Sequence, residues 1–141
     1  MELDHVDLKI IEALTRDSRT PFTKIADELG LSETAIRKRV RRLRETEVIR
    51  RFTIEVDYSK IGIRVIFVGV DVKPEKYEDV CRKLRGIRFI KRLYAAVGSY
   101  DMLAEVWVRA CEEDVKTLLD EIERIEGVHK VHYAVITNVL K

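Results

Sequence analysis

The spacing of apolar residues changes once along this 141-residue chain, and the change constrains the fold more than any other feature. Up to Leu43 the apolar residues recur every three or four positions, which is the period of a helix with one buried side. From Ile63 onward, short runs of alternating strand-like residues are separated by further stretches of helical spacing. The sequence therefore predicts a small helical unit followed by a unit that mixes strands and helices.

Three short helices account for the first part of the chain. The first has Asp4 and Asp7 near its start, where the helix dipole favours negative charge. We expect Thr20 to cap the second helix, with Pro21 at its first position, and Gly30 to end it in a left-handed conformation. Ser32 is expected to cap the third helix. The inward-facing residues predicted for the three helices are Leu3, Val6, Ile10, Ile11, Leu14, Phe22, Ile25, Ala26, Leu29, Ile36, Val40 and Leu43.

The rest of the chain predicts a strand over 48–56 and then a βαββαβ order. Its expected elements are strands at 63–72, 89–97, 102–108 and 128–139 and helices at 74–85 and 112–125. This order is that of a ferredoxin-like fold, in which both helices cover the same face of the sheet. Alternate residues of the first strand are apolar on both faces, so we expect a second subunit to cover the bare face in a two-fold dimer. Cover by the N-terminal part is the alternative.

These patterns predict an α+β protein with three segments. A winged helix-turn-helix of three helices plus a strand is expected over residues 1–50, and a linker strand or hinge over 51–62. The βαββαβ domain, which we expect to carry the oligomer contacts, occupies 63–141.

Positive charge is concentrated in one segment. The chain has 27 lysines and arginines against 25 aspartates and glutamates, and this net charge of +2 by itself argues against a nucleic-acid partner. Between residues 33 and 51, however, eight basic residues stand against three acidic ones, which leaves +5 there and −3 elsewhere. A helix, a turn containing glycine and a basic helix predict a helix-turn-helix that enters the major groove of DNA.

We expect eight residues to contact DNA. Thr34, Arg37, Lys38 and Arg41 are candidates for base or groove contacts, because they share the outer face of the third helix. Arg42, Arg50 and Arg51 are candidates for phosphate contacts, and Ser32 for a contact at the start of the helix. The alternative is that the arginines form only a solvated helix face.

At this point the chain resembles the Lrp/AsnC (feast/famine) family of transcriptional regulators over nearly all its length. The resemblance rests on DLKII at 7–11, ADELGLS at 26–32, RRL at 41–43, VI at 48–49 and GSYD at 98–101. It implies a DNA-binding regulator that forms homodimers and often tetramers or octamers, with an amino-acid effector. The effector residues that it implies are Gly98, Ser99, Tyr100, Asp101 and Thr137.

Other kinds of site are not predicted. His129 and His132 lie three apart on a strand and point to opposite faces, so we expect no metal, and no cofactor is called for. Cys81 and Cys111 are expected to be reduced, and residues 131–140, the longest stretch without a charged residue, are too short to span a membrane. We therefore expect a cytoplasmic protein.

The single asparagine and absence of glutamine, with abundant charged residues, indicate a thermophile.

Two other functions fit parts of the sequence. An architectural protein would wrap DNA with little sequence preference, and its binding would depend mainly on salt. A second alternative is an enzyme, because some proteins that resemble this family are sirohaem decarboxylases, in which His129, His132 or Arg64 would have to act on carboxylates. The basic helix has no purpose in such an enzyme, so we expect no catalysis.

Overall fold

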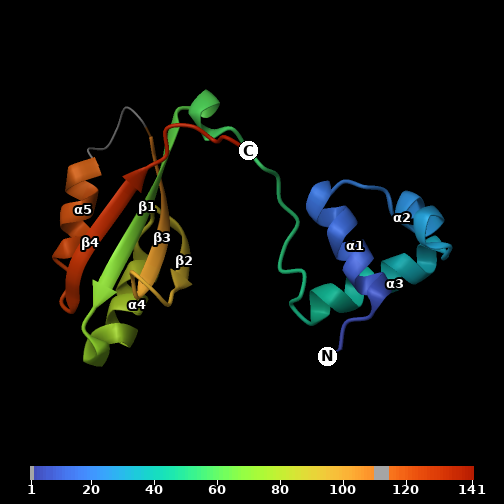
Figure 1. Cartoon of the computed structure of the whole chain (residues 1–141), viewed down its shortest axis with the longest axis horizontal. Helices are drawn as coiled ribbons and strands as arrows, with labels where there is room; N and C mark the ends of the chain where they lie inside the picture. Colours follow the sequence, from blue (N-terminus) through green and yellow to red (C-terminus); the bar gives the residue numbers. More distant parts are fainter. Residues whose placement is uncertain (1, 110–114) are drawn as a thin grey trace. The chain divides into compact units, whose positions relative to one another are not determined.

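The computed structural model describes residues 2–109 and 115–141 and divides the chain into two compact units (Figure 1). The N-terminal unit is Met1–Val56 and the C-terminal unit is Asp57–Lys141. The boundary falls inside the segment 51–62 that was expected to be a linker. The start of the helix expected at 112, together with Cys111, lies outside the described residues.

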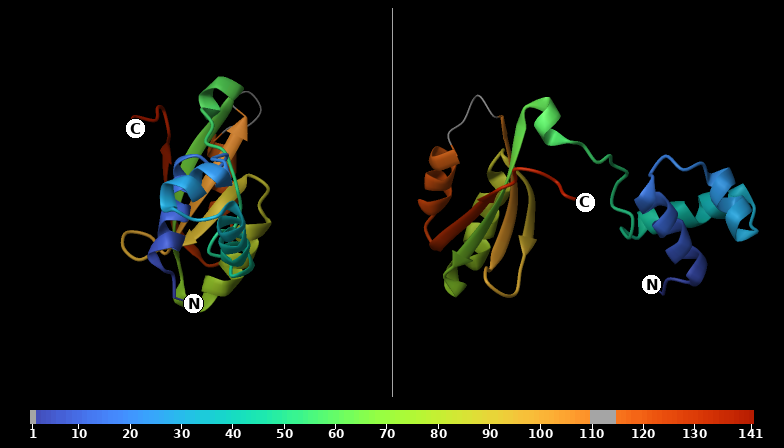
Figure 2. Two further views of the ribbon diagram at one scale, coloured as in Figure 1. Left: turned by 90° about the vertical axis from the view of Figure 1, so that its right-hand side faces the viewer. Right: turned by 45° about the horizontal axis from the view of Figure 1, so that its top comes forward.

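Three helices form the N-terminal unit, as the apolar periodicity predicts (Figure 2). They are α1 (His5–Arg16), α2 (Phe22–Leu29) and α3 (Glu33–Glu45). Their inward-facing residues share one core, in which Ile10, Leu14, Ile25, Ala26, Ile36, Val40 and Leu43 are buried. Burial of these stripes holds the helices together, because helices this short are marginal in isolation.

The helix ends follow the expected chemistry, with one exception. Gly30 ends α2 with φ of 65°, and the Ser32 hydroxyl oxygen accepts a hydrogen bond from the Ala35 N–H at 3.1 Å. The prediction for Thr20 was wrong: Pro21 occupies the N-cap of α2, and the Thr20 hydroxyl donates to the Asp17 carbonyl at 2.7 Å. The Thr20 hydroxyl is bonded within the turn that follows α1, so this hydroxyl does not reach the backbone N–H groups of α2.

The strand expected over 48–56 is absent, so this part of the winged helix-turn-helix prediction was wrong. The segment is irregular, although Val48, Phe52 and Ile54 are apolar and exposed. A strand needs a neighbour to accept and donate its backbone hydrogen bonds. No strand of the described chain pairs with this segment, so its alternation of residue types does not become a sheet.

The C-terminal unit has the predicted βαββαβ order, with an antiparallel sheet in the order β2-β3-β1-β4. Its strands are β1 (Ile63–Val72), β2 (Ile90–Ala95), β3 (Met102–Arg109) and β4 (Val128–Val135), and its helices are α4 (Tyr77–Gly86) and α5 (Val115–Glu123). Two 3-10 turns, η1 (Tyr58–Ile61) and η2 (Pro74–Lys76), precede β1 and α4. The α+β fold class is confirmed, although β2 and β4 end earlier than expected.

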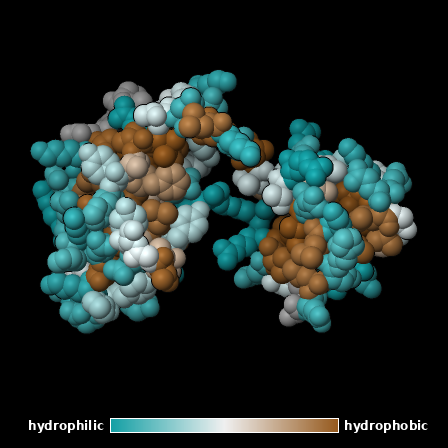
Figure 3. Space-filling view, viewed as in Figure 1, coloured by the Kyte–Doolittle hydropathy of each residue, from teal (hydrophilic) through white to brown (hydrophobic). Residues whose placement is uncertain are grey.

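The two faces of this sheet have different surroundings. Ile66, Val68 and Val70 are fully buried with residues of α4 and α5, so both helices cover this face. On the other face Val65 and Phe67 stay partly exposed, and the ring of Tyr58 lies 4.3 Å from that of Trp107. Figure 3 shows an apolar area on the surface of the unit. The expectation of one helix-covered face and one bare apolar face is therefore met in the single chain.

No helix in the described part of the chain is both long enough and apolar enough to cross a membrane.

Gly69 in β1 provides a test of this packing. A Cβ atom at this position would lie 2.6 Å from the Tyr100 ring, so Gly69→Ala must displace the ring. We expect the free energy of unfolding of the C-terminal unit to fall by about 1–3 kcal/mol, which calorimetry would detect as a lower Tm. Gly86→Ala is the control, because a Cβ there meets nothing within 4 Å. Equal Tm values for the two variants would contradict the contact.

Candidate nucleic-acid interface and effector turn

The outer face of α3 carries four of the predicted DNA-binding residues. Thr34, Arg37, Lys38 and Arg41 are all exposed on this helix. Arg37 forms an ion pair with Glu33, and the Arg41 Nε lies 3.7 Å from a carboxylate oxygen of Glu45. Such exposed pairs contribute little free energy, so phosphate groups can replace their acidic partners at small cost.

Ser32 contributes to this face indirectly. Its hydroxyl oxygen is occupied by the N-cap hydrogen bond to Ala35, so it fixes where α3 begins. The start of the helix in turn determines which side chains share the exposed face, with Thr34 in the first turn and Arg37 one turn later. Ser32 thus has an N-cap role in the structure, and the DNA contact that the sequence predicts for it stays a prediction.

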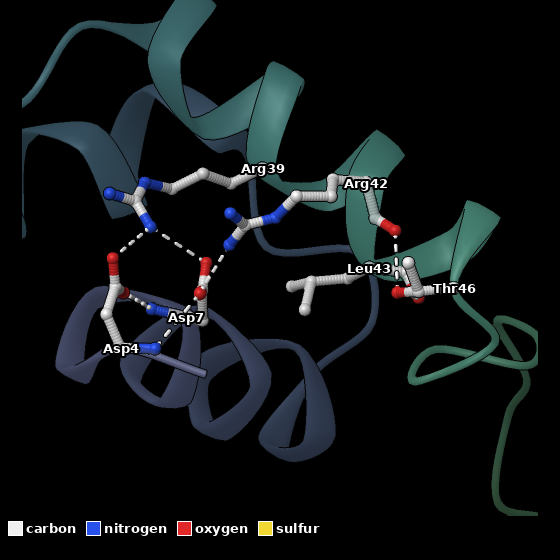
Figure 4. A network of polar contacts seen from close by, with 6 residues as sticks. All are labelled: Asp4, Asp7, Arg39, Arg42, Leu43 and Thr46. Atoms are coloured by element: carbon white, nitrogen blue, oxygen red, sulfur yellow. Dashed lines mark hydrogen bonds and ion pairs between the residues drawn. The ribbon is translucent and has the colours of Figure 1, made fainter. Parts of the chain in front are cut away.

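Arg42 differs from its neighbours. The sequence placed it on the outer face, but its Nη2 lies 2.5 Å from Oδ2 of Asp7 on α1 (Figure 4). Asp7 is fully buried and also accepts a hydrogen bond from Arg39 Nη1 at 2.9 Å. The Arg42 side chain is nevertheless 45% exposed. The sequence missed Asp7 as a partner of α3, since its position suggested only a favourable helix dipole.

Two grooves of the N-terminal unit are lined by basic residues, and one of them contains residues of α3. One, of about 430 Å³, is lined by apolar residues, including Phe22 and Phe52, and by four arginines and one glutamate. The arginines are Arg37, Arg41, Arg44 and Arg50. Arg44 was missed by the sequence analysis, and its guanidinium lies 5.9 Å from the centre of the Phe52 ring. Its position seven residues after Arg37 was the available signal, because residues so spaced lie on one side of a helix.

Arg50 and Arg51 lie in the irregular segment after α3. Both are exposed, and both line a second groove of about 640 Å³ together with Arg16 and Arg19 at the end of α1. The strand that was expected to carry Arg50 and Arg51 is not formed, so the segment itself does not fix their direction. Their cationic neighbours make this end of the unit attractive to a phosphate backbone.

The turn between β2 and β3 holds four of the five predicted effector residues, Gly98 to Asp101. Gly98 has φ of 137°, a conformation that favours glycine, and Ser99 beside it is exposed. The Asp101 carboxylate accepts a hydrogen bond from the Val72 N–H at 2.7 Å, which fastens the turn to the end of β1. One oxygen of Asp101 therefore has a structural role.

The surroundings of Tyr100 and Thr137, both predicted for the effector site, differ from each other. Tyr100 lies over Gly69, and its ring is 5.2 Å from that of His132 on β4. Thr137 was expected on the last strand but lies beyond the end of β4, exposed, because pairing with β1 stops at Val135. His132 was not predicted as a neighbour of this turn. Its Nε2 also lies 3.4 Å from a carboxylate oxygen of Asp71 on β1.

The described residues contain no group of three or more histidine, cysteine, aspartate or glutamate side chains that could hold a metal ion.

Electrostatics around the start of α1 favour the charged forms of its groups. A hydrogen bond from the Asp7 N–H and another from Arg39 hold the pKa of the Asp4 carboxyl below its usual value. The carboxylates of Asp4 and Asp7 raise the pKa of Arg39, chiefly because Arg39 donates hydrogen bonds first to Asp4 and then to Asp7. Asp4 and Arg39 therefore stay charged near neutral pH.

Comparison with known proteins adds independent findings. Residues 3–44 match the AsnC-type helix-turn-helix domain, and residues 65–141 match the Lrp/AsnC ligand binding domain. The chain is 41% identical over 140 residues to the HTH-type transcriptional regulator LrpA of Pyrococcus horikoshii, covering 99% of both chains. It is 36% identical to the HTH-type transcriptional regulator FL11 of Pyrococcus furiosus, over 99% of this chain and 92% of that protein.

Solved structures agree with these matches. The crystal structure of PH0061 has a TM-score of 0.90 and 27% identity, and the match covers 100% of this chain and 97% of that one. The feast or famine regulatory protein Rv3291c from M. tuberculosis, complexed with L-methionine, has a TM-score of 0.83 and 25% identity, over 99% and 95% of the two chains.

The lowered pKa of Asp4 leads to a pH-dependent prediction. A carboxyl whose pKa is depressed by folding stabilises the fold above its usual pKa of 3.8 and loses that contribution as pH falls through the lowered value. Asp4→Asn keeps a capping oxygen but removes the charge. We expect it to be less stable than the original chain near neutral pH, with the difference vanishing in acid. Urea unfolding followed by circular dichroism between about pH 2 and pH 6 tests this, and a constant difference would contradict it.

Proposed function

The chain belongs to the Lrp/AsnC family of transcriptional regulators, and on this premise we propose that α3 binds a specific DNA sequence in the major groove. The observation that carries the proposal is the cationic outer face of α3. Arg37, Lys38 and Arg41 are exposed together on a helix whose opposite side is buried in the core of the N-terminal unit. A rigid helix that presents arginine can read guanine with two hydrogen bonds at once.

The exposed residues divide between base and phosphate contacts. We assign base or groove contacts to Thr34, Arg37, Lys38 and Arg41, which lie on the outer face of the helix. Phosphate contacts are assigned to the arginines near the helix end and in the segment after it: Arg42, Arg44, Arg50 and Arg51.

We propose a homodimer, and the apolar surface that the single chain leaves uncovered supports it. The sheet has a partly exposed apolar face, and exposed Phe52 and Ile54 lie in a segment of strand-like alternation with which no described strand pairs. A two-fold copy would cover such surfaces and present two α3 helices to half-sites about one DNA turn apart. Tetramers or octamers built from such dimers are the larger assemblies that we propose.

Selection of bound duplexes from a random pool tests this function. We expect a palindromic motif to be enriched, and Arg41→Ala to weaken binding to that motif by about 1–3 kcal/mol if Arg41 reads a base. Arg82→Ala is the matched control, because Arg82 is an exposed helical arginine paired with Asp79 in the other unit. Enrichment of no motif, with binding that depends only on salt, would support an architectural protein instead.

We further propose that an amino acid binds at the turn of Gly98, Ser99, Tyr100 and Asp101. The relative from M. tuberculosis is complexed with L-methionine, and residues 65–141 match a ligand binding domain. Backbone N–H groups of a glycine turn can bind a carboxylate, and a carboxylate such as that of Asp101 can bind an ammonium group. Thr137, exposed past β4, remains a candidate contact.

A thermal-shift screen of the protein amino acids tests the effector. An effector present at about 100 times its Kd would stabilise the folded protein by about 2.7 kcal/mol, so its Tm rises. Asp101→Asn keeps an oxygen for the Val72 N–H but removes the charge, and we expect it to abolish the rise. An unchanged rise in this variant would place the ammonium group elsewhere.

The proposed role is binding without catalysis. The relatives that match along almost all of this chain are named as transcriptional regulators. We propose a cytoplasmic location on the ground that a regulator must reach chromosomal DNA. The relatives LrpA and FL11 come from Pyrococcus, which agrees with the thermophile composition of the chain.

A further inference from the structure

One carboxylate in the N-terminal unit is fully buried and yet contacts the basic helix. Asp7 on α1 has no exposed side-chain surface. It accepts hydrogen bonds from three donors, which are Arg39 Nη1 at 2.9 Å, Arg42 Nη2 at 2.5 Å and the Asp4 N–H at 3.2 Å (Figure 4). Burial of a carboxylate is unfavourable unless it is paired and hydrogen-bonded, so these donors compensate for it.

Hydrogen bonds restrain Arg42 both at its guanidinium and at its backbone. The guanidinium is held by Asp7, and the backbone carbonyl of Arg42 accepts a hydrogen bond from the Thr46 hydroxyl at 2.8 Å. Leu43, the next residue, is fully buried in the core. Arg42 therefore has little freedom to change its direction, although nearly half of its side chain is exposed.

The side chain of Arg41, on the same helix, is held less firmly than that of Arg42. Its side chain is 72% exposed, and its pairing with Glu45 at 3.7 Å joins two exposed groups. A side chain held in this way samples many directions and can follow a phosphate into many registers. Arg42 is the next residue along the sequence, but it is paired with Asp7 on another helix.

We propose that Asp7 is a positioning residue for DNA recognition, which fixes the Arg42 guanidinium toward one phosphate when α3 lies in its specific register. A guanidinium has five N–H donors, so those not used by Asp7 remain for a phosphate. This inference rests on the proposed function of α3. Because Arg42 is already ordered, less side-chain entropy is lost when it binds that phosphate.

The same carboxylate weakens binding in other registers. Its negative charge offsets that of Arg42, and the fixed guanidinium cannot follow phosphates that lie elsewhere. Asp7 thus raises the ratio of specific to non-specific affinity, and its loss lowers specific binding while non-specific binding is kept or strengthened.

The experiment compares affinities for two duplexes, the one enriched from the random pool and a scrambled duplex of the same composition. We expect Asp7→Asn to lower the ratio of the two affinities by about five- to tenfold, a change of the size produced by one misplaced contact. Asp4→Asn is the matched control, because Asp4 belongs to the same network but bonds to Arg39 and not to Arg42. Its ratio should stay within about twofold of the original.

A double variant separates positioning from general stability. If Asp7 acts through Arg42, Asp7→Asn has no further effect on the ratio in an Arg42→Ala background. A drop that persists without Arg42, or an unchanged ratio in Asp7→Asn, would overturn the proposal.

A third variant leaves the buried carboxylate intact and so does not depend on the folding of Asp7→Asn. Arg42→Lys keeps the charge but cannot bind Asp7 and a phosphate with one planar group, and we expect it to lower the ratio as well. An unchanged ratio here also counts against positioning. Failure to enrich any motif with the original chain would instead remove the proposed function itself.

Discussion

Mutual burial of three short helices is the interaction on which the recognition surface depends. Helices of 12, 8 and 13 residues are marginal alone, and α3 in addition carries closely spaced positive charges that repel one another. Ile36, Val40 and Leu43 overcome this by packing against the apolar stripes of α1 and α2. The basic face is therefore held rigidly because the opposite face is apolar.

Charge compensation around α3 is uneven, and the unevenness has a functional meaning. Glu33 and Glu45 pair with arginines at the exposed surface, where partners exchange easily. Asp7 pairs with Arg39 and Arg42 from a fully buried position, where exchange would leave a carboxylate without a partner. In our proposal, the exposed arginines of this helix attract DNA, and Arg42, which Asp7 holds, suits a single register.

The C-terminal unit ties its candidate effector turn to its sheet. Asp101 bonds to the end of β1, and the Tyr100 ring lies over Gly69 in the middle of the same strand. A ligand that moves this turn must therefore disturb β1, which pairs with both β3 and β4. In the homodimer that we propose, a second subunit on the bare face of the sheet, with Val65 and Trp107, would experience such a change.

The sequence by itself determined the helices, the βαββαβ order, the caps at Gly30 and Ser32 and the position of the basic helix. These features depend on residues within a turn or two of one another, so periodicity and capping chemistry were sufficient. Only the tertiary structure decided the role of Asp7, which meets Arg42 across 35 positions, and the place of Tyr100 over Gly69. It also decided that the strand expected over 48–56 does not form in the single chain, because pairing depends on a neighbour that local residues cannot supply.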